Sequence, residues 1–101
     1  MTKLYVTEYA GVAYITPGGV PVPQNPPIAS QVVDYTAGVA ASTAFNPATK
    51  LIRIHADSIC SVAFGTAPTA TTGTARLIAG QTEYHGVPKG KAFKVSAITN
   101  T

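Results

Sequence analysis

The sequence has few charged residues, a single cysteine and no tryptophan. Charged residues make up 11% of the 101 residues, whereas typical soluble domains carry about 25%. Threonine, alanine, serine and glycine take their place. Because charge keeps protein surfaces apart, an uncharged and threonine-rich surface is poorly protected against association. We therefore expect partner proteins to cover part of this surface.

Other absences exclude whole classes of protein. No apolar run approaches the roughly 18 residues of a membrane-spanning helix, so we expect no membrane partner. Residues 1–11 alternate in polarity and lack the apolar block of a secretory signal. The lone Cys60 cannot form an intramolecular disulfide, which fits synthesis in a reducing cytoplasm. The net charge of +3 is too small for a basic stripe of the kind that binds nucleic acid.

The residues that are present favour strands throughout. Val, Ile, Thr, Tyr and Phe recur in short runs separated by Gly, Pro, Asn and Asp. Strands are expected at 3–9, 11–16, 51–56, 59–64, 75–79, 82–85 and 93–99, with two weaker ones around Gly38. The run 59–64 is expected to pair antiparallel with 51–56, and a short helix over 37–44 competes with the weaker strands. The whole chain, 1–101, is predicted to form one all-β domain, a small jelly-roll-like β-sandwich or barrel.

One segment departs from this pattern. Residues 17–27 (PGGVPVPQNPP) hold five of the eight prolines. Because proline removes backbone donors and fixes φ, we expect an extended arm or loop that reaches a neighbouring subunit. The candidate contact residues in it are Pro17, Val20, Val22, Pro23, Pro26 and Pro27.

Alternation along the strands predicts the core. It is expected to contain Ile52, Ile54, Val62, Phe64, Leu77, Phe93 and Val95. Cys60 shares a face with Val62 and Phe64, so we expect a small buried side chain there.

No set of residues suggests catalysis. The four acids, Glu8, Asp34, Asp57 and Glu83, lie far apart and are interpreted as solvated strand ends and turn caps. His55, Asp57 and Ser58 lack the G-x-S-x-G turn of a nucleophile. We therefore predict that the protein is not an enzyme.

Metal and cofactor sites are not expected either. His55, Cys60 and His85 have no metal-ligand spacing. The stretch GTAPTATTG lacks the lysine of a phosphate-binding loop. Lys89, Lys91 and Lys94 could contact single-stranded nucleic acid, but their basic footprint is small.

The C-terminal half contains a series of strand and turn residues: Phe64–Gly65, Pro68–Thr71, Leu77–Gly80, Glu83–Val87, Gly90 and Val95–Ile98. This pattern resembles one found in small structural proteins of tailed bacteriophages. The resemblance implies a virion component, assembled in the bacterial cytoplasm. It suggests above all a capsid decoration or cement protein that binds the major capsid protein as a homo-oligomer, with a trimer favoured.

Two alternatives remain beside this interpretation. One is a minor head–tail junction, tail or fibre component, and the other is a small binding module for glycans or single-stranded nucleic acid. In either virion role, the charge-poor stretch 64–80 is expected to act as a contact surface through Thr69, Thr71 and Thr72.

Overall fold

The computed structural model describes residues 2–14, 21–23 and 25–100. Its ten strands follow one another along the chain, and no helix occurs among the described residues. The strands are β1 (Lys3–Tyr9), β2 (Val12–Tyr14), β3 (Pro21–Pro23), β4 (Ala29–Asp34), β5 (Ala40–Ala41), β6 (Leu51–Ala56), β7 (Cys60–Gly65), β8 (Ala75–Leu77), β9 (Thr82–Gly86) and β10 (Lys94–Thr99). The all-β prediction is confirmed.

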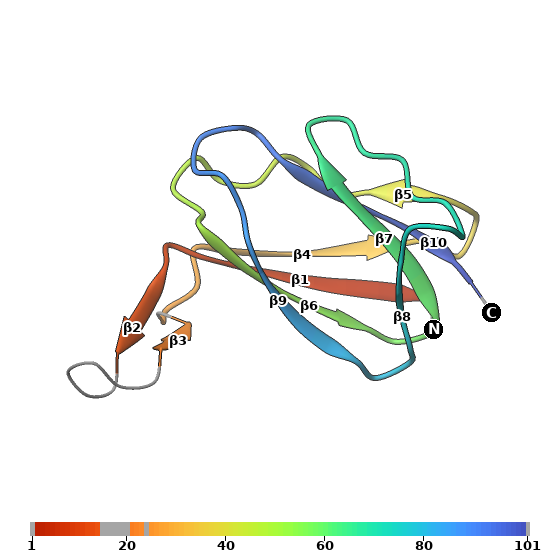
Figure 1. Cartoon of the computed structure of the whole chain (residues 1–101), viewed down its shortest axis with the longest axis horizontal. Helices are drawn as coiled ribbons and strands as arrows, with labels where there is room; N and C mark the ends of the chain where they lie inside the picture. Colours follow the sequence, from red (N-terminus) through yellow and green to blue (C-terminus); the bar gives the residue numbers. More distant parts are fainter. Residues whose placement is uncertain (1, 15–20, 24, 101) are drawn as a thin grey trace.

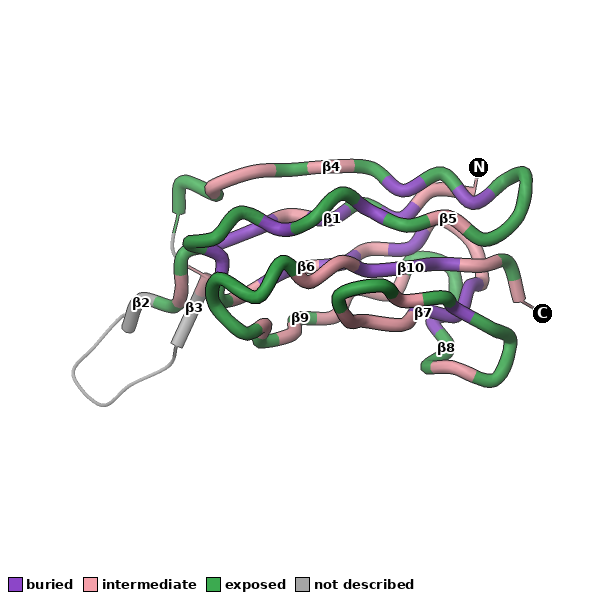
Figure 2. Tube along the Cα trace, turned by 90° about the horizontal axis from the view of Figure 1, so that it is seen from above, coloured by how far each residue is buried: buried purple, intermediate pink, exposed green. Residues whose placement is uncertain are grey.

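Two antiparallel four-stranded sheets face each other (Figures 1 and 2). The first has the order β4-β1-β6-β9, and the second has the order β5-β10-β7-β8. Buried side chains from both sheets form one core between the layers. The chain crosses from one sheet to the other after β4, β5, β6, β8 and β9, so distant segments meet in each layer.

Alternation of side chains explains why these strands pack in this way. In β6, Ile52, Ile54 and Ala56 are buried, while the residues between them are half-exposed. A strand of period two with one apolar face must bury that face against another layer. Of the predicted core, Ile52, Ile54, Val62, Leu77 and Val95 are buried. Phe64 and Phe93 are only half-buried and pack against the edge of the core.

The structure corrects the expected pairing of the central hairpin. The strands β6 and β7 are joined by a tight connection but lie in different sheets. The strand β6 pairs with β1 and β9, and β7 pairs with β10 and β8. The connection therefore turns a corner between layers, which residue preferences alone do not distinguish from a hairpin turn. The competing helix over 37–44 is not formed, and the short strand β5 lies there instead.

Within the described residues, the predicted strand at 11–16 begins at Val12 and is the strand β2. The strand β2 pairs with β3, with Val12 opposite Pro23 and Tyr14 opposite Pro21. The Pro-rich segment thus contributes one side of a two-stranded ribbon that projects from one end of the sandwich (Figures 1 and 2). Residues 17–20 and 24 lie outside the described residues.

Candidate interaction surfaces

A buried carboxylate organises one end of the molecule. Glu8, at the end of β1, is only 2% exposed. Its Oε1 accepts hydrogen bonds from the Asn46 backbone N–H at 2.7 Å and from the Thr49 hydroxyl at 2.8 Å. Its Oε2 accepts a third from the Gln31 side-chain amide at 3.2 Å. The interpretation of Glu8 as a solvated residue is wrong, because three donors replace the water that burial removes.

Gln31 extends this network to the other sheet. Its Oε1 accepts hydrogen bonds from the backbone N–H and the hydroxyl of Thr43, both at 3.0 Å. Thr43 belongs to the stretch 42–45 that follows β5 and runs beside β10, where Ser42 and Phe45 donate to Val95 and Phe93. The amide of Gln31 therefore joins β4 of one sheet to the border of the other. This closes the β4–β5 edge with neutral groups and one buried charge.

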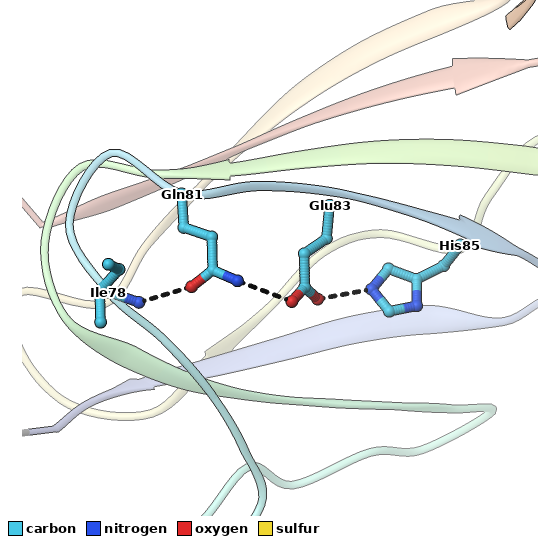
Figure 3. A network of polar contacts seen from close by, with 4 residues as sticks. All are labelled: Ile78, Gln81, Glu83 and His85. Carbon is cyan, nitrogen blue, oxygen red and sulfur yellow. Dashed lines mark hydrogen bonds and ion pairs between the residues drawn. The ribbon is translucent and has the colours of Figure 1, made fainter.

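The opposite edge carries a second polar chain (Figure 3). Gln81 accepts from the Ile78 backbone N–H at 3.0 Å and donates to Glu83 at 2.9 Å. Glu83 in turn contacts His85 Nε2 at 3.0 Å, with both side chains 34% exposed. The Phe64 ring lies with its centroid 4.8 Å from that of His85. Glu83 and His85 stand opposite buried Ile54 and Ile52, so they occupy the inner face of an edge strand. Inward charges of this kind block pairing with another strand.

These contacts separate the residues that catalysis or metal binding would need. His55 Nδ1 bonds the Thr82 hydroxyl at 2.7 Å, whereas Ser58 lies near the hydroxyl of Tyr35. Within the described part of the chain, no three His, Cys, Asp or Glu side chains lie where they could hold a metal ion. None of the described residues forms a helix long and apolar enough to cross a membrane.

The buried interior holds two titratable groups with perturbed ionisation. Burial raises the pKa of the Tyr35 hydroxyl, which donates to the Ser58 carbonyl at 2.9 Å. Burial also raises the pKa of the neighbouring Cys60 thiol. Cys60 is buried, which confirms the prediction of a small buried side chain at this position. A protonated, enclosed thiol of this kind is a poor nucleophile.

The contact residues expected from the sequence fall in two places. Of those in the Pro-rich segment, Pro17 and Val20 lie outside the described residues, and Val22 belongs to the backbone of β3. Pro23 ends β3 and is half-buried, and Pro26 and Pro27 are exposed just beyond it.

The second group lies in the loop between β7 and β8. Thr69, Thr71 and Thr72 are exposed there, on either side of buried Ala70. The Ala70 backbone N–H donates to the Ser96 hydroxyl at 3.0 Å, which fixes the loop to β10. The loop thus presents its threonines from an anchored backbone.

The lysines considered for nucleic acid do not form a continuous groove. Lys89 and Lys91 are exposed around the turn before β10, and Lys94 is half-buried at the start of that strand. Phe93 beside them packs against the core and offers little face for stacking.

The most extensive candidate surface was missed from the sequence. Residues 9–49 contain one charged residue, Asp34, while all seven Lys and Arg lie elsewhere. This charge-poor region, residues 9–49, builds the ribbon β2–β3, the edge strand β4 and the strand β5. Val12, Val32 and Val39 are exposed within it. A count of charges along the chain would have found it.

A scan against protein-family models finds no match, and neither a search of curated proteins nor a search of solved structures finds one. The surfaces of the chain itself therefore carry the functional interpretation.

Proposed function

We propose that the protein is a non-enzymatic structural subunit of a tailed-phage particle, acting as a capsid decoration or cement protein. The single observation that supports this most is the charge-poor region, residues 9–49. It leaves one edge and one projecting ribbon of the sandwich without the charges that keep free proteins apart.

The geometry suits a subunit that bridges neighbours. The molecule extends 44 Å along its longest axis and 21 Å along its shortest. The ribbon β2–β3 projects from one end, and the anchored loop 66–74 presents exposed threonines. A pre-ordered element loses less entropy on docking than a flexible one. Many copies with weak contacts to major capsid subunits would sum to firm attachment.

Finer features belong to the same proposal. The crossings between sheets support a jelly-roll-like sandwich, with the Pro-rich segment as the arm that reaches a neighbour. The charge-poor region, residues 9–49, is poorly protected against association, which supports a homo-oligomer. The phage resemblance favours a trimer. The protein would act in the virion, after assembly in the host cytoplasm.

Mixing the purified protein with undecorated capsids and sedimenting them tests the proposal. We expect the protein to co-sediment and to raise the temperature at which the capsids open. A variant with Val32→Asp and Val39→Asp should bind less, whereas Arg76→Gln on the short strand β8 should bind like the wild type. Absence of co-sedimentation would contradict the cement role.

Copy number separates this role from a related one. Hundreds of copies in each particle fit a cement protein, whereas a dozen or fewer would point to a head–tail junction, tail or fibre piece. Quantitative mass spectrometry of purified particles gives that number.

A further inference from the structure

The outer face of the first sheet is ordered in three rows across its strands. The strand register aligns Asp34, Lys3 and Asp57 in the first row, because Lys3 pairs with Asp34 and its carbonyl accepts the Asp57 N–H. The second row is Val32, Tyr5, His55 and Thr82. The third row is Ser30, Thr7, Arg53 and Tyr84. We call this surface the three-row face.

On the three-row face, an acid lies at one end of the line along β6 and a base lies within that line. Asp34 is already engaged, since its Oδ1 accepts hydrogen bonds from the Thr36 N–H and hydroxyl at 3.0 and 2.6 Å. These bonds, with help from nearby Lys3, lower the pKa of Asp34. The side chains of Asp57 and Arg53 have no hydrogen-bond or ion-pair partner among the described residues. One unpaired acid thus lies in the first row and one unpaired guanidinium in the third.

The middle row of the three-row face exposes two large side chains beside the polar pair His55 and Thr82. Tyr5 is 38% exposed and Val32 is 51% exposed, next to a shallow groove of about 390 Å³ that Thr7 and Arg53 also line. Exposed tyrosine and arginine are the side chains enriched at the centres of protein interfaces.

We propose that the three-row face pairs with the same face of a second copy about a two-fold axis that runs along the second row. Residues two apart on a strand are about 6.8 Å apart, so the first and third rows lie equally far from this axis. Arg53 lies in β6 and Asp57 directly follows this strand, so both residues lie on one line along the strand direction, on opposite sides of the axis. Rotation about the axis therefore places Asp57 of each copy over Arg53 of the other. Tyr5 and Val32 then meet their own counterparts, as a two-fold interface requires.

The size of the three-row face limits the area that the two copies can bury against each other. Three rows by four strands cover about 20 Å by 19 Å, or roughly 400 Å². That is about half of the area that each partner buries in a stable complex. We therefore expect a weak dimer, since interfaces of full size already extend to micromolar affinity. The dimer predicts an even number of copies, against the trimer favoured by the resemblance, and it does not depend on binding to a capsid.

Sedimentation equilibrium up to about 1 mM protein at low salt tests the dimer through charge reversal. For the wild type we expect the average mass to rise from 10.4 kDa toward twice that value. Arg53→Asp and Asp57→Arg should each weaken the dimer at least tenfold, because each places like charges opposite one another. The double variant should return to within about threefold of the wild type, since the pair is restored with reversed sign. Arg76→Asp, the same change on β8 of the other sheet, should have no effect on the Kd.

Two results would overturn the proposal. One is a wild type that stays monomeric at about 1 mM, which would leave the face to a different kind of partner. Titration with an acidic peptide and with a short single-stranded oligonucleotide would then identify which. The other is a double variant no better than the single ones. Capsid co-sedimentation measured with the same variants separates this outcome from failure of the cement role.

Discussion

The two edges of the sandwich, β4–β5 and β8–β9, differ in the polar contacts that stabilise them. At the β4–β5 edge, the buried carboxylate of Glu8 and the amide of Gln31 tie a loop to both sheets. At the β8–β9 edge, Glu83 and His85 form a half-exposed pair on an inward-facing position. The first edge exposes a single charged side chain, Asp34 at the end of β4, whereas the second carries the Glu83–His85 pair.

This difference suits the two edges to different functions, one to contact with a partner and the other to preventing the addition of a strand. An edge with few surface charges is easy for a partner to cover, because few charges need to lose their water. Internal hydrogen bonds keep the shape of such an edge while it is covered. A charged inward-facing edge discourages a further strand from adding to the sheet. We therefore expect particle contacts through the β4–β5 side, and no added strand at the free edge of β9.

Removing the buried carboxylate should have the largest effect on stability. Glu8→Ala leaves three donors without an acceptor inside the protein, so we expect a loss of about 3 kcal/mol in the free energy of unfolding. Glu8→Gln keeps the shape and one oxygen and should lose less. Urea unfolding followed by circular dichroism measures both. Equal losses in the two variants would show that the shape and the single amide oxygen of glutamine restore nothing, so that the carboxylate carries the whole effect.

Cutting the bridge between sheets should have a smaller effect at the same edge. Gln31→Ala removes the acceptor for Thr43 and one donor to Glu8, and we expect a loss of about 1.5 kcal/mol. Hydrogen exchange should rise at the Thr43 N–H while that of β7 stays unchanged. Unchanged exchange at Thr43 would contradict the bridge.

Disrupting the opposite edge should matter least to stability. Glu83→Gln and His85→Ala act on side chains exposed by a third, so each should cost under about 1 kcal/mol. Their effect should appear instead as aggregation, because the inward charge that guards β9 is weakened. Light scattering over time at high protein concentration measures it. A loss as large as that of Glu8→Ala would remove the contrast between the edges.

A further prediction concerns the dependence of stability on pH, which arises from two buried groups that belong to neither edge. Burial raises the pKa of Tyr35 and of Cys60 in the folded state. Their ordinary values are about 10 and 8.5, so the unfolded chain loses these protons first as the pH rises. Stability should be full below about pH 8.5 and fall gradually above it. Tyr35→Phe should flatten part of this fall in a series of unfolding curves, and an unchanged slope would exclude Tyr35 as its source.

The sequence predicts the strands well because period-two alternation is local. The buried and half-exposed faces of β6 follow from the letters LIRIHA alone. The partner strands of β6 do not follow from these letters, because the turn residues Asp57 and Ser58 fit both a hairpin turn and a connection between two sheets. Glu8 was misjudged for a related reason. Its donors come from residues 23 to 41 positions away, and no local pattern brings them together.

The exposed surfaces were only partly predictable. The Pro-rich segment was noticed for its prolines, yet its pairing with β2 depends on a register that proline obscures. The three-row face combines alternate residues of four strands that are distant in the sequence, so it can be recognised only once the sheet order is known.

We propose that the chain is a particle subunit held through its charge-poor side. A density map of phage particles purified from cells that make this protein is the most direct test. We expect many copies on the capsid, with the edge β4–β5 or the ribbon β2–β3 against neighbouring subunits. Particles that lack the chain, or copies whose charge-poor region faces solvent, would contradict it.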